Sequence, residues 1–134
     1  MAKFSAASLK QRATLHPRLQ LVFDEAIKYY DFAIIEGFRG KTLQNKAFAT
    51  GKSKLPWPLG SHNKTPSKAA DLAPFPIDWS DRSQALVRFG ILAGVIKTCA
   101  ERLKVRIRWG GDWNRNWDPR DETFLDWGHF ELDE

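Results

Sequence analysis

The spacing of apolar residues predicts three helices along the chain. Apolar side chains recur every three or four positions over residues 17–30, a segment that begins with a proline suited to the first helical turn. A longer helix is expected over residues 80–104, with Ser80 as its N-cap. A short helix over residues 42–50 is expected to end at Gly51. The buried face of the long helix is predicted to comprise Leu86, Phe89, Ala93, Ile96, Ala100 and Leu103.

Other segments show the patterns of strands and loops. Short apolar runs bounded by glycine or proline favour buried strands, and alternating apolar and charged residues favour a half-buried strand. The predicted strands cover residues 32–38, 69–75, 105–109 and 124–132. The segment 52–68 contains three prolines, and 112–123 is polar and rich in tryptophan, so both are expected to be loops.

The order of these elements predicts the fold class. Helices and strands follow as α-β-α-loop-β-α-β-β, which is typical of an α+β domain with a mostly antiparallel sheet. At 134 residues, the chain is expected to form a single domain, residues 1–134, and to be a monomer.

Composition narrows the partners and the compartment. The formal charge of +5 and the isoelectric point near 9.5 favour an anionic partner, and nucleic acid, anionic lipid and bacterial cell wall all qualify. No segment approaches the roughly 20 apolar residues of a membrane span, and the N-terminal segment lacks the apolar core of a signal peptide. We therefore expect synthesis in a cytoplasm without a secretion signal. The single cysteine, Cys99, is expected to be a small buried hydrophobe.

Two of the three histidines stand near carboxylates and suggest a metal site. His62 and Asp71 are joined by a short loop, and His129 belongs to the last predicted strand. Two imidazoles, one carboxylate and an open position are what a hydrolytic zinc site requires. The same ligand set also describes a non-haem iron site, so it does not identify the metal by itself.

Further residues near these motifs are candidates for catalysis. Asp126, three positions before His129, is the candidate general base. Glu131 is the alternative base, or it orients His129 from behind. Arg39 follows a predicted strand and is a candidate for binding a substrate carboxylate or stabilising an oxyanion. His16 lies far from these motifs along the chain and is left out of the site.

An alternative of a different class is a basic module without catalytic activity that binds nucleic acid or cell wall. Aromatic and basic residues together form stacking platforms for nucleic acid. The tryptophans Trp109, Trp113, Trp117 and Trp127 lie among the arginines Arg106, Arg108, Arg115 and Arg120. Such a module would bind DNA in a salt-sensitive way that ignores loss of His62 or His129.

These segments resemble a known family. The run from Ser61 to Pro74, which holds His62 and Asp71, is similar to the first zinc motif of the M15 family of peptidoglycan peptidases. That family includes VanY-like D-Ala-D-Ala carboxypeptidases and phage endolysins that cut between L-alanine and D-glutamate. Three further segments resemble the phage branch: Phe75-Pro76-Ile77-Asp78-Trp79, Arg108-Trp109-Gly110-Gly111-Asp112-Trp113 and Asp126-Trp127-Gly128-His129-Phe130-Glu131-Leu132. The segment Gly37-Phe38-Arg39 resembles the arginine-bearing turn that family members place near the substrate.

The resemblance implies a site and an activity. It implies Zn²⁺ on His62, Asp71 and His129, a base at Asp126 and a substrate-stabilising role for Arg39. It also implies a phage endolysin that cleaves the stem peptide of bacterial peptidoglycan, is made in the host cytoplasm and reaches the wall at lysis. A D-Ala-D-Ala carboxypeptidase or dipeptidase remains the alternative within the family.

Overall fold

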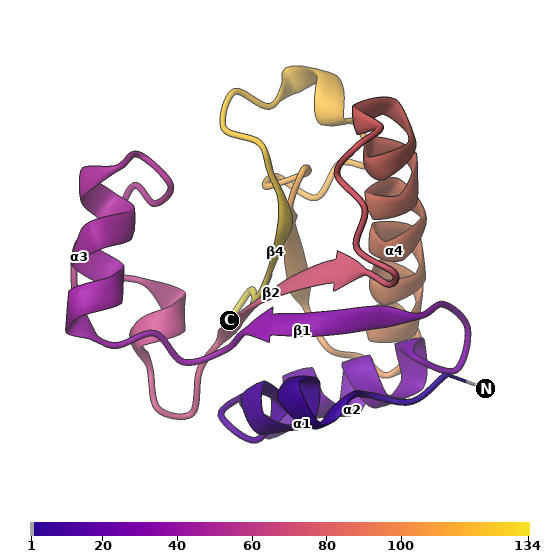
Figure 1. The fold of residues 1–134 in the computed structure, drawn as a ribbon, viewed down its shortest axis with the longest axis horizontal. Coiled ribbons are helices and arrows are strands. Elements are labelled where there is room, and N and C mark those ends of the chain that lie inside the picture. The colour runs from indigo at the N-terminus through magenta and orange to yellow at the C-terminus, as the bar shows by residue number, and fades with distance from the viewer. Residues whose placement is uncertain (1) are drawn as a thin grey trace.

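One antiparallel sheet organises the molecule. The computed structural model describes residues 2–134, whose four strands are ordered β1-β2-β4-β3 (Figure 1). The predicted α+β class with an antiparallel sheet is confirmed. The elements are α1 (Ala6–Arg12), α2 (Pro17–Ala26), β1 (Phe32–Glu36), α3 (Lys41–Ala49), the 3₁₀ helix η1 (Ser61–Asn63), β2 (Ala69–Pro74), α4 (Arg82–Arg102), β3 (Ile107–Gly110), the 3₁₀ helix η2 (Pro119–Asp121) and β4 (Asp126–Leu132).

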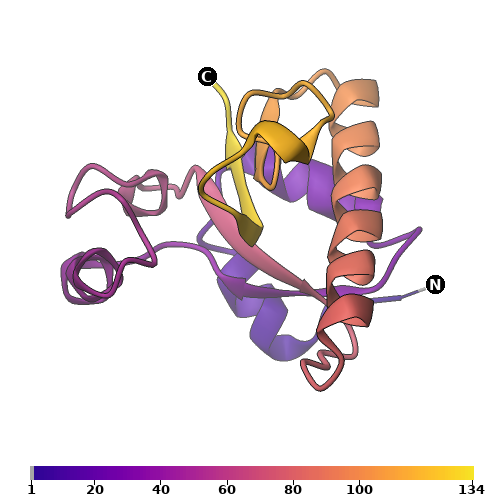
Figure 2. The ribbon, with the colours of Figure 1, turned by 90° about the horizontal axis from the view of Figure 1, so that it is seen from above.

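The hydrophobic core lies between one face of the sheet and two helices. Helix α4 packs against β2, β3 and β4, and α2 packs against α4. Phe23 from α2, Ile96 from α4 and Phe130 from β4 are all fully buried there. Burying a side chain of this size contributes about 1.5–3 kcal/mol. In both ribbon views α3 lies on the opposite side of the molecule from α4, so the core leaves the α3 side of the sheet open for other chemistry (Figures 1 and 2).

Helix α4 begins one residue later than the predicted cap. The side chain of Asp81 accepts a hydrogen bond from the Gln84 N–H and is the N-cap, so the prediction of Ser80 is wrong. The hydroxyl of Ser80 instead donates to Asp78. The predicted stripe is otherwise correct at its centre, but Leu86 and Leu103 are only partly buried. The buried residues of α4 are Ala85, Phe89, Leu92, Ala93, Ile96, Cys99 and Ala100.

The remaining boundaries differ by a few residues from the predicted ones. Helix α2 stops at Ala26, and residues 27–30 continue only as turns. Strand β1 stops at Glu36 because the chain then enters the turn that carries Arg39. Strands β3 and β4 begin at Ile107 and Asp126, each two residues later than predicted. In each case apolar residues extend beyond the hydrogen-bonded part of the helix or strand, so the apolar pattern predicts an element that is too long.

Helix α1 was not predicted from the apolar pattern, because polar side chains rather than apolar ones attach it to the sheet. Only Ser8 is buried among its residues. The Ser8 hydroxyl accepts a hydrogen bond from the Ile34 N–H, and the next acceptors along the chain, Gln11 Oε1 and Thr14 Oγ1, take the N–H groups of Gly37 and Phe38. These side chains cover the edge of β1 and the turn after it, which would otherwise present unpaired N–H groups.

Two further expectations concern burial and membranes. The Cys99 side chain is 2% exposed, and burial raises the pKa of its thiol, as expected of a small hydrophobic residue. Within residues 2–134, the structure contains no helix with the length and apolar character that a membrane crossing demands.

The capping assignment can be tested by paired substitutions. Asp81→Ala removes the acceptor for the Gln84 N–H and is expected to lower the free energy of unfolding by about 1 kcal/mol. Ser80→Ala, the matched control, is expected to change it by less than half as much. Urea denaturation of both variants measures the difference, and equal losses would contradict the assignment.

Candidate active site

The pairing of two central strands brings Asp71 and His129 together. The register of β2 and β4 places these residues directly opposite each other. Directly opposed residues have Cβ atoms about 4.5–5.5 Å apart, so their side chains meet on one face. The carboxylate Oδ1 of Asp71 lies 3.5 Å from His129 Nδ1. The sheet therefore brings together two of the three predicted ligands.

His62 arrives from the loop before β2 and is fixed by a neighbouring turn. The 3₁₀ turn η1 carries it, and its Nδ1 lies 2.7 Å from the Gly37 carbonyl oxygen. The backbone bonds back as well, because the Arg39 N–H donates to the His62 carbonyl at 2.9 Å. With Nδ1–H donating to Gly37, the lone pair of Nε2 faces Asp71 Oδ1 at 3.5 Å.

The three donor atoms fit a metal ion. His62, Asp71 and His129 each offer one ligand atom, and these atoms lie within 4.8 Å of one another. Two donors bound tetrahedrally at zinc distances are about 3.4 Å apart, close to the two 3.5 Å separations here. His62 Nε2 and Asp71 Oδ1 are buried without a hydrogen-bond partner within residues 2–134. Buried polar atoms are normally satisfied, so this group could hold a metal ion.

Charge in the metal-free site is held by mutual pairing. Burial alone would raise the pKa of Asp71, but the close approach and positive charge of His129 and His62 hold this pKa far below its usual range. Burial alone would lower the pKa of His129, but Asp71 and Glu131 raise it to about 9. A metal ion that binds His129 has to compete with the proton that this raised pKa favours.

Glu131 orients His129 from the side away from the donors. Its Oε1 lies 2.6 Å from His129 Nε2, and its Oε2 accepts from Arg108 at 2.7 Å. Burial would raise the pKa of Glu131, but bonds to His129 and Arg108 lower it to about 2. A carboxylate behind a ligating histidine fixes the tautomer and the ring orientation. Of the two sequence-based roles for Glu131, the geometry favours orientation over general base.

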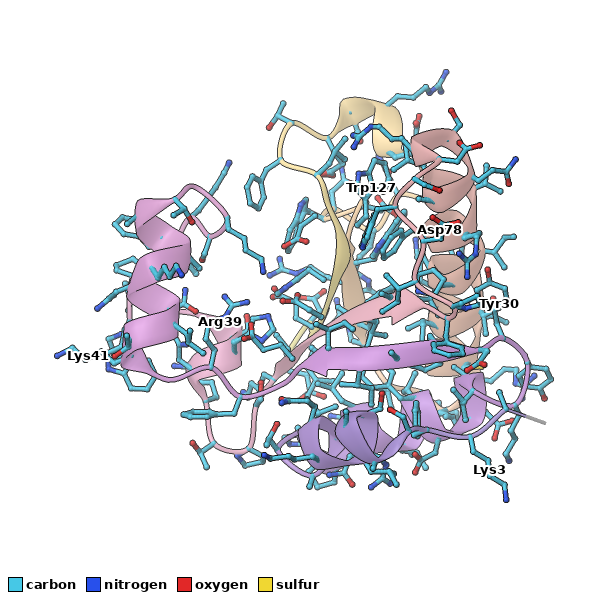
Figure 3. All side chains as sticks on the ribbon, in the orientation of Figure 1. Lys3, Tyr30, Arg39, Lys41, Asp78 and Trp127 are labelled. Carbon is cyan, nitrogen blue, oxygen red and sulfur yellow. The ribbon has the colours of Figure 1, made fainter. Side chains whose placement is uncertain are left out.

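Arg39 lies behind the donor set between α3 and the sheet (Figure 3). It is 5% exposed, and its guanidinium donates to Glu36, Gln44 and the Oδ2 atom of Asp71, the last at 3.1 Å. It thus occupies the carboxylate oxygen that is turned away from the histidines. Most of its N–H groups are already used by the protein, although the residue still lines the cleft.

Asp126 is partly buried at the start of β4. It lines the same cleft as His62 and His129. Burial and the nearby negative charge of Asp71 raise its pKa. A raised pKa moves a carboxylate towards the range in which a general base works near neutral pH. The structure thus brings Asp126 to the cleft that holds the predicted ligands.

A cleft of about 630 Å³ opens over the donor set. One wall is the segment 52–61 after α3, and the other is the segment 122–126 before and at the start of β4. The ring of Trp113 packs 5.3 Å from the His129 ring and stacks on Phe124, and its Nε1 donates to the Phe124 carbonyl. Trp113 therefore supports the second wall of the cleft beside His129.

The remaining tryptophans do not join one platform. Trp109 is a buried core residue, and Trp127 packs against it with 5.7 Å between ring centroids. Regular alternation along a strand would place Trp127 on the same face as His129. The pairing of β3 and β4 is irregular next to Trp109, and Trp127 packs against the core instead. Figure 3 shows Trp127 on the α4 side. Trp117 is exposed elsewhere, against Lys97. The four arginines all form ion pairs with carboxylates: Arg106 with Asp133, Arg108 with Glu131, Arg115 with Asp133 and Arg120 with Asp118.

Comparison with known proteins places this chain in a family. The family model described as phage L-alanyl-D-glutamate peptidase matches residues 1–133. The L-alanyl-D-glutamate peptidase of Escherichia phage T5 is 36% identical over 138 residues, which cover 97% of each chain. The chain belongs to the phage L-alanyl-D-glutamate peptidase family. The resemblance found in the sequence motifs is thereby confirmed.

The fold of this family member also has a solved relative. The crystal structure of the Serratia marcescens L-Ala D-Glu endopeptidase ChiX matches with a TM-score of 0.75, at 23% identity. The match covers 98% of this chain and 90% of that one. At this identity the likeness establishes the shared fold.

Several supporting residues were not found from the sequence. Asn63 accepts from the Gly60 N–H and donates to the Arg39 carbonyl, while Gln44 accepts from both Arg39 and Asn63. The Gly37 carbonyl completes this support through His62. Gln44 and Ala47 are the buried residues of α3, and a buried polar side chain such as Gln44 is not identified by an apolar pattern. The one sequence signal for this support is that Asn63 directly follows His62. His16, omitted from the site, caps α2 by accepting from the Arg18 N–H.

Gly128 lets β4 approach β2 beside the donors. A Cβ at Gly128 would lie 2.7 Å from the Leu72 carbonyl oxygen. Gly128→Ala is therefore expected to lower the free energy of unfolding by about 1–3 kcal/mol and to weaken metal binding at His129. Gly94→Ala is the control, since its Cβ would meet nothing within 4 Å and a helical alanine stabilises by up to about 1 kcal/mol. Denaturant unfolding compares the two, and an unchanged Gly128→Ala variant would contradict the close approach.

Proposed function

We propose that the chain is a single catalytic domain that hydrolyses the L-alanyl-D-glutamate bond of the peptidoglycan stem peptide with a zinc ion on His62, Asp71 and His129. The observation that carries this proposal is the convergence of three donor atoms, two of them buried and unpartnered, in a member of this peptidase family. Amide hydrolysis involves no change of oxidation state. Zinc therefore suits the site better than iron, which uses the same ligand types for redox chemistry.

Each residue has a distinct role in this mechanism. A zinc ion held by His62, Asp71 and His129 would act as a Lewis acid that polarises the scissile carbonyl and lowers the pKa of a bound water. Asp126 takes the proton of the attacking water and returns it to the leaving amine of D-glutamate. Glu131 holds His129 in the tautomer that directs Nδ1 to the site. Arg39 holds Asp71 through Oδ2 and adds positive charge beside the oxyanion that forms on the substrate.

The T5 relative supports a proposal for the biological setting. The T5 protein carries the same activity in its name and matches this chain almost end to end. We infer that this chain acts as a phage endolysin in host lysis, is made in the host cytoplasm and reaches the wall when the host lyses. A monomer is sufficient, because all proposed ligands and the base come from one chain.

Product analysis tests the proposed reaction. Purified peptidoglycan is digested with the zinc-loaded protein and with a chelator-treated control, and the products are analysed by mass spectrometry. A chelator-sensitive product with a new amino terminus on D-glutamate is the expected outcome. Release of terminal D-alanine alone would replace the proposal with the carboxypeptidase alternative, and absence of any product would refute the peptidase assignment.

Metal binding can be measured apart from activity. Zinc at one hundred times its dissociation constant is expected to stabilise the wild-type fold by about 2.7 kcal/mol. His129→Ala removes one donor and is expected to lose most of this stabilisation and all lysis of outer-membrane-stripped cells. Thermal unfolding with and without zinc measures the effect. Wild-type zinc stabilisation and full lysis in His129→Ala would remove the ligand assignment.

The proposed base has a different signature from the ligands. Asp126→Asn is expected to lower kcat by about 10²–10⁴-fold while zinc stabilisation of the fold remains. Glu101→Gln neutralises an exposed acid on α4 and is expected to leave both quantities unchanged. Hydrolysis rates and zinc titration on the same samples separate the two roles. Loss of zinc stabilisation in Asp126→Asn would assign this residue to the metal group.

A further inference from the structure

The cleft has two halves of different charge that meet at Lys52 and Asp126. One half is the cleft over the donor set, whose walls also carry Lys54 and Arg108. The other half, about 440 Å³, is lined by apolar and aromatic side chains together with the acids Glu36, Asp71 and Asp126. Lys52 and Asp126 line both halves. A substrate lying across the site therefore has one basic side and one aromatic side.

The basic half retains two cations without carboxylate partners. Arg108 is paired with Glu131. Lys52 and Lys54 are exposed and form no ion pair within the described chain, residues 2–134. Lys54 extends across the cleft, where its Nζ lies 4.8 Å from the centre of the Phe124 ring on the opposite wall. A cation–π contact at an exposed site is worth about 0.5–1 kcal/mol, so an anion can replace it.

The acidic side chains of the basic half are either hydrogen-bonded to other residues or partly buried. Glu131 is bonded to His129 and Arg108, and Glu122 accepts from the Asn114 N–H. Asp126 is partly buried, and burial together with the negative charge of Asp71 raises its pKa. The two lysines are thus the charges of this half that are left to meet a substrate. Their complement is a carboxylate.

The proposed substrate carries such a carboxylate next to the scissile bond. A glutamate residue joined onward through one of its two carboxyl groups keeps the other one free. That free carboxylate lies within a few bonds of the amide nitrogen that leaves. Asp126, the proposed proton donor to that nitrogen, lines the basic half together with Lys52 and Lys54. The two lysines therefore lie on the side of the site where the free carboxylate of the substrate is expected.

We propose that Lys52 and Lys54 form the subsite that recognises the free carboxylate of the D-glutamate residue after the scissile bond. The inference rests on the proposed function and adds to it the direction of the substrate. The acidic, D-glutamate side lies in the basic half between residues 52–54 and Phe124, and the L-alanine side lies towards the aromatic half. The subsite distinguishes a free carboxylate from its amide, because an uncharged amide makes no ion pair with lysine.

Two matched peptides test this subsite. Both are N-acetyl-L-alanyl-γ-D-glutamyl-L-lysine, and they differ only in whether the α-carboxyl of D-glutamate is free or amidated. The wild-type protein is expected to cleave the free acid with a kcat/KM about tenfold higher than the amide, mainly through KM. In the double variant Lys52→Gln, Lys54→Gln this preference is expected to disappear, because activity on the acid falls to the level on the amide.

A charge-matched control isolates the subsite from the net charge. Lys3→Gln, Lys41→Gln removes the same charge at two lysines whose side chains point away from the body of the protein, and it is expected to keep the wild-type preference (Figure 3). An equal loss on both peptides, or an unchanged preference in the Lys52, Lys54 variant, would overturn the subsite while leaving the hydrolytic assignment intact. A wild-type protein that cleaves neither peptide would overturn the proposed function itself, and the subsite with it.

Discussion

The buried carboxylate of Asp71 is the constraint around which the site is built. An ionised carboxylate away from water is costly unless charges and hydrogen bonds surround it. Here Arg39 holds Oδ2, while His62 and His129 face Oδ1, which has no hydrogen-bond partner of its own within residues 2–134. Each of these partners is fixed in turn, His62 by the Gly37 carbonyl and His129 by Glu131. The donor geometry is therefore in place before a metal ion binds, so little ordering remains to oppose binding.

The fold separates stability from chemistry by using the two sides of the sheet differently. Helices α2 and α4 bury the apolar face, and the core extends to Trp109 and Trp127. The opposite side carries the donors, the cleft and the segment after α3. Because charged groups that face one another destabilise a fold unless they are paired, placing them away from the core limits their effect on stability. It also leaves the cleft walls, residues 52–61 and 122–126, as segments outside the hydrophobic core.

The sequence-based proposal for the site rests on a residue type that has few alternative explanations. The chain has three histidines, and two of them occur with acids in the quoted motifs; the structure brings His62, Asp71 and His129 together and places Asp126 at the same cleft. Arg39 was also proposed from the sequence, but its bonds to Asp71, Glu36 and Gln44 were not. The directions of side chains in turns depend on contacts between distant segments. No periodic pattern encodes such contacts.

What the sequence determined by itself was the class of the fold, the central elements and the identity of the candidate ligands. Apolar periodicity predicts helices and strands because burial acts on every residue of a regular element in the same way. Only the tertiary structure decided that Asp71 stands opposite His129, that Glu131 lies against His129 Nε2, and that Trp127 packs against the core. It also decided that α1 closes the edge of β1 with polar side chains. Register, bulges and hydrogen bonds between distant segments depend on three-dimensional pairing, which local pattern does not contain.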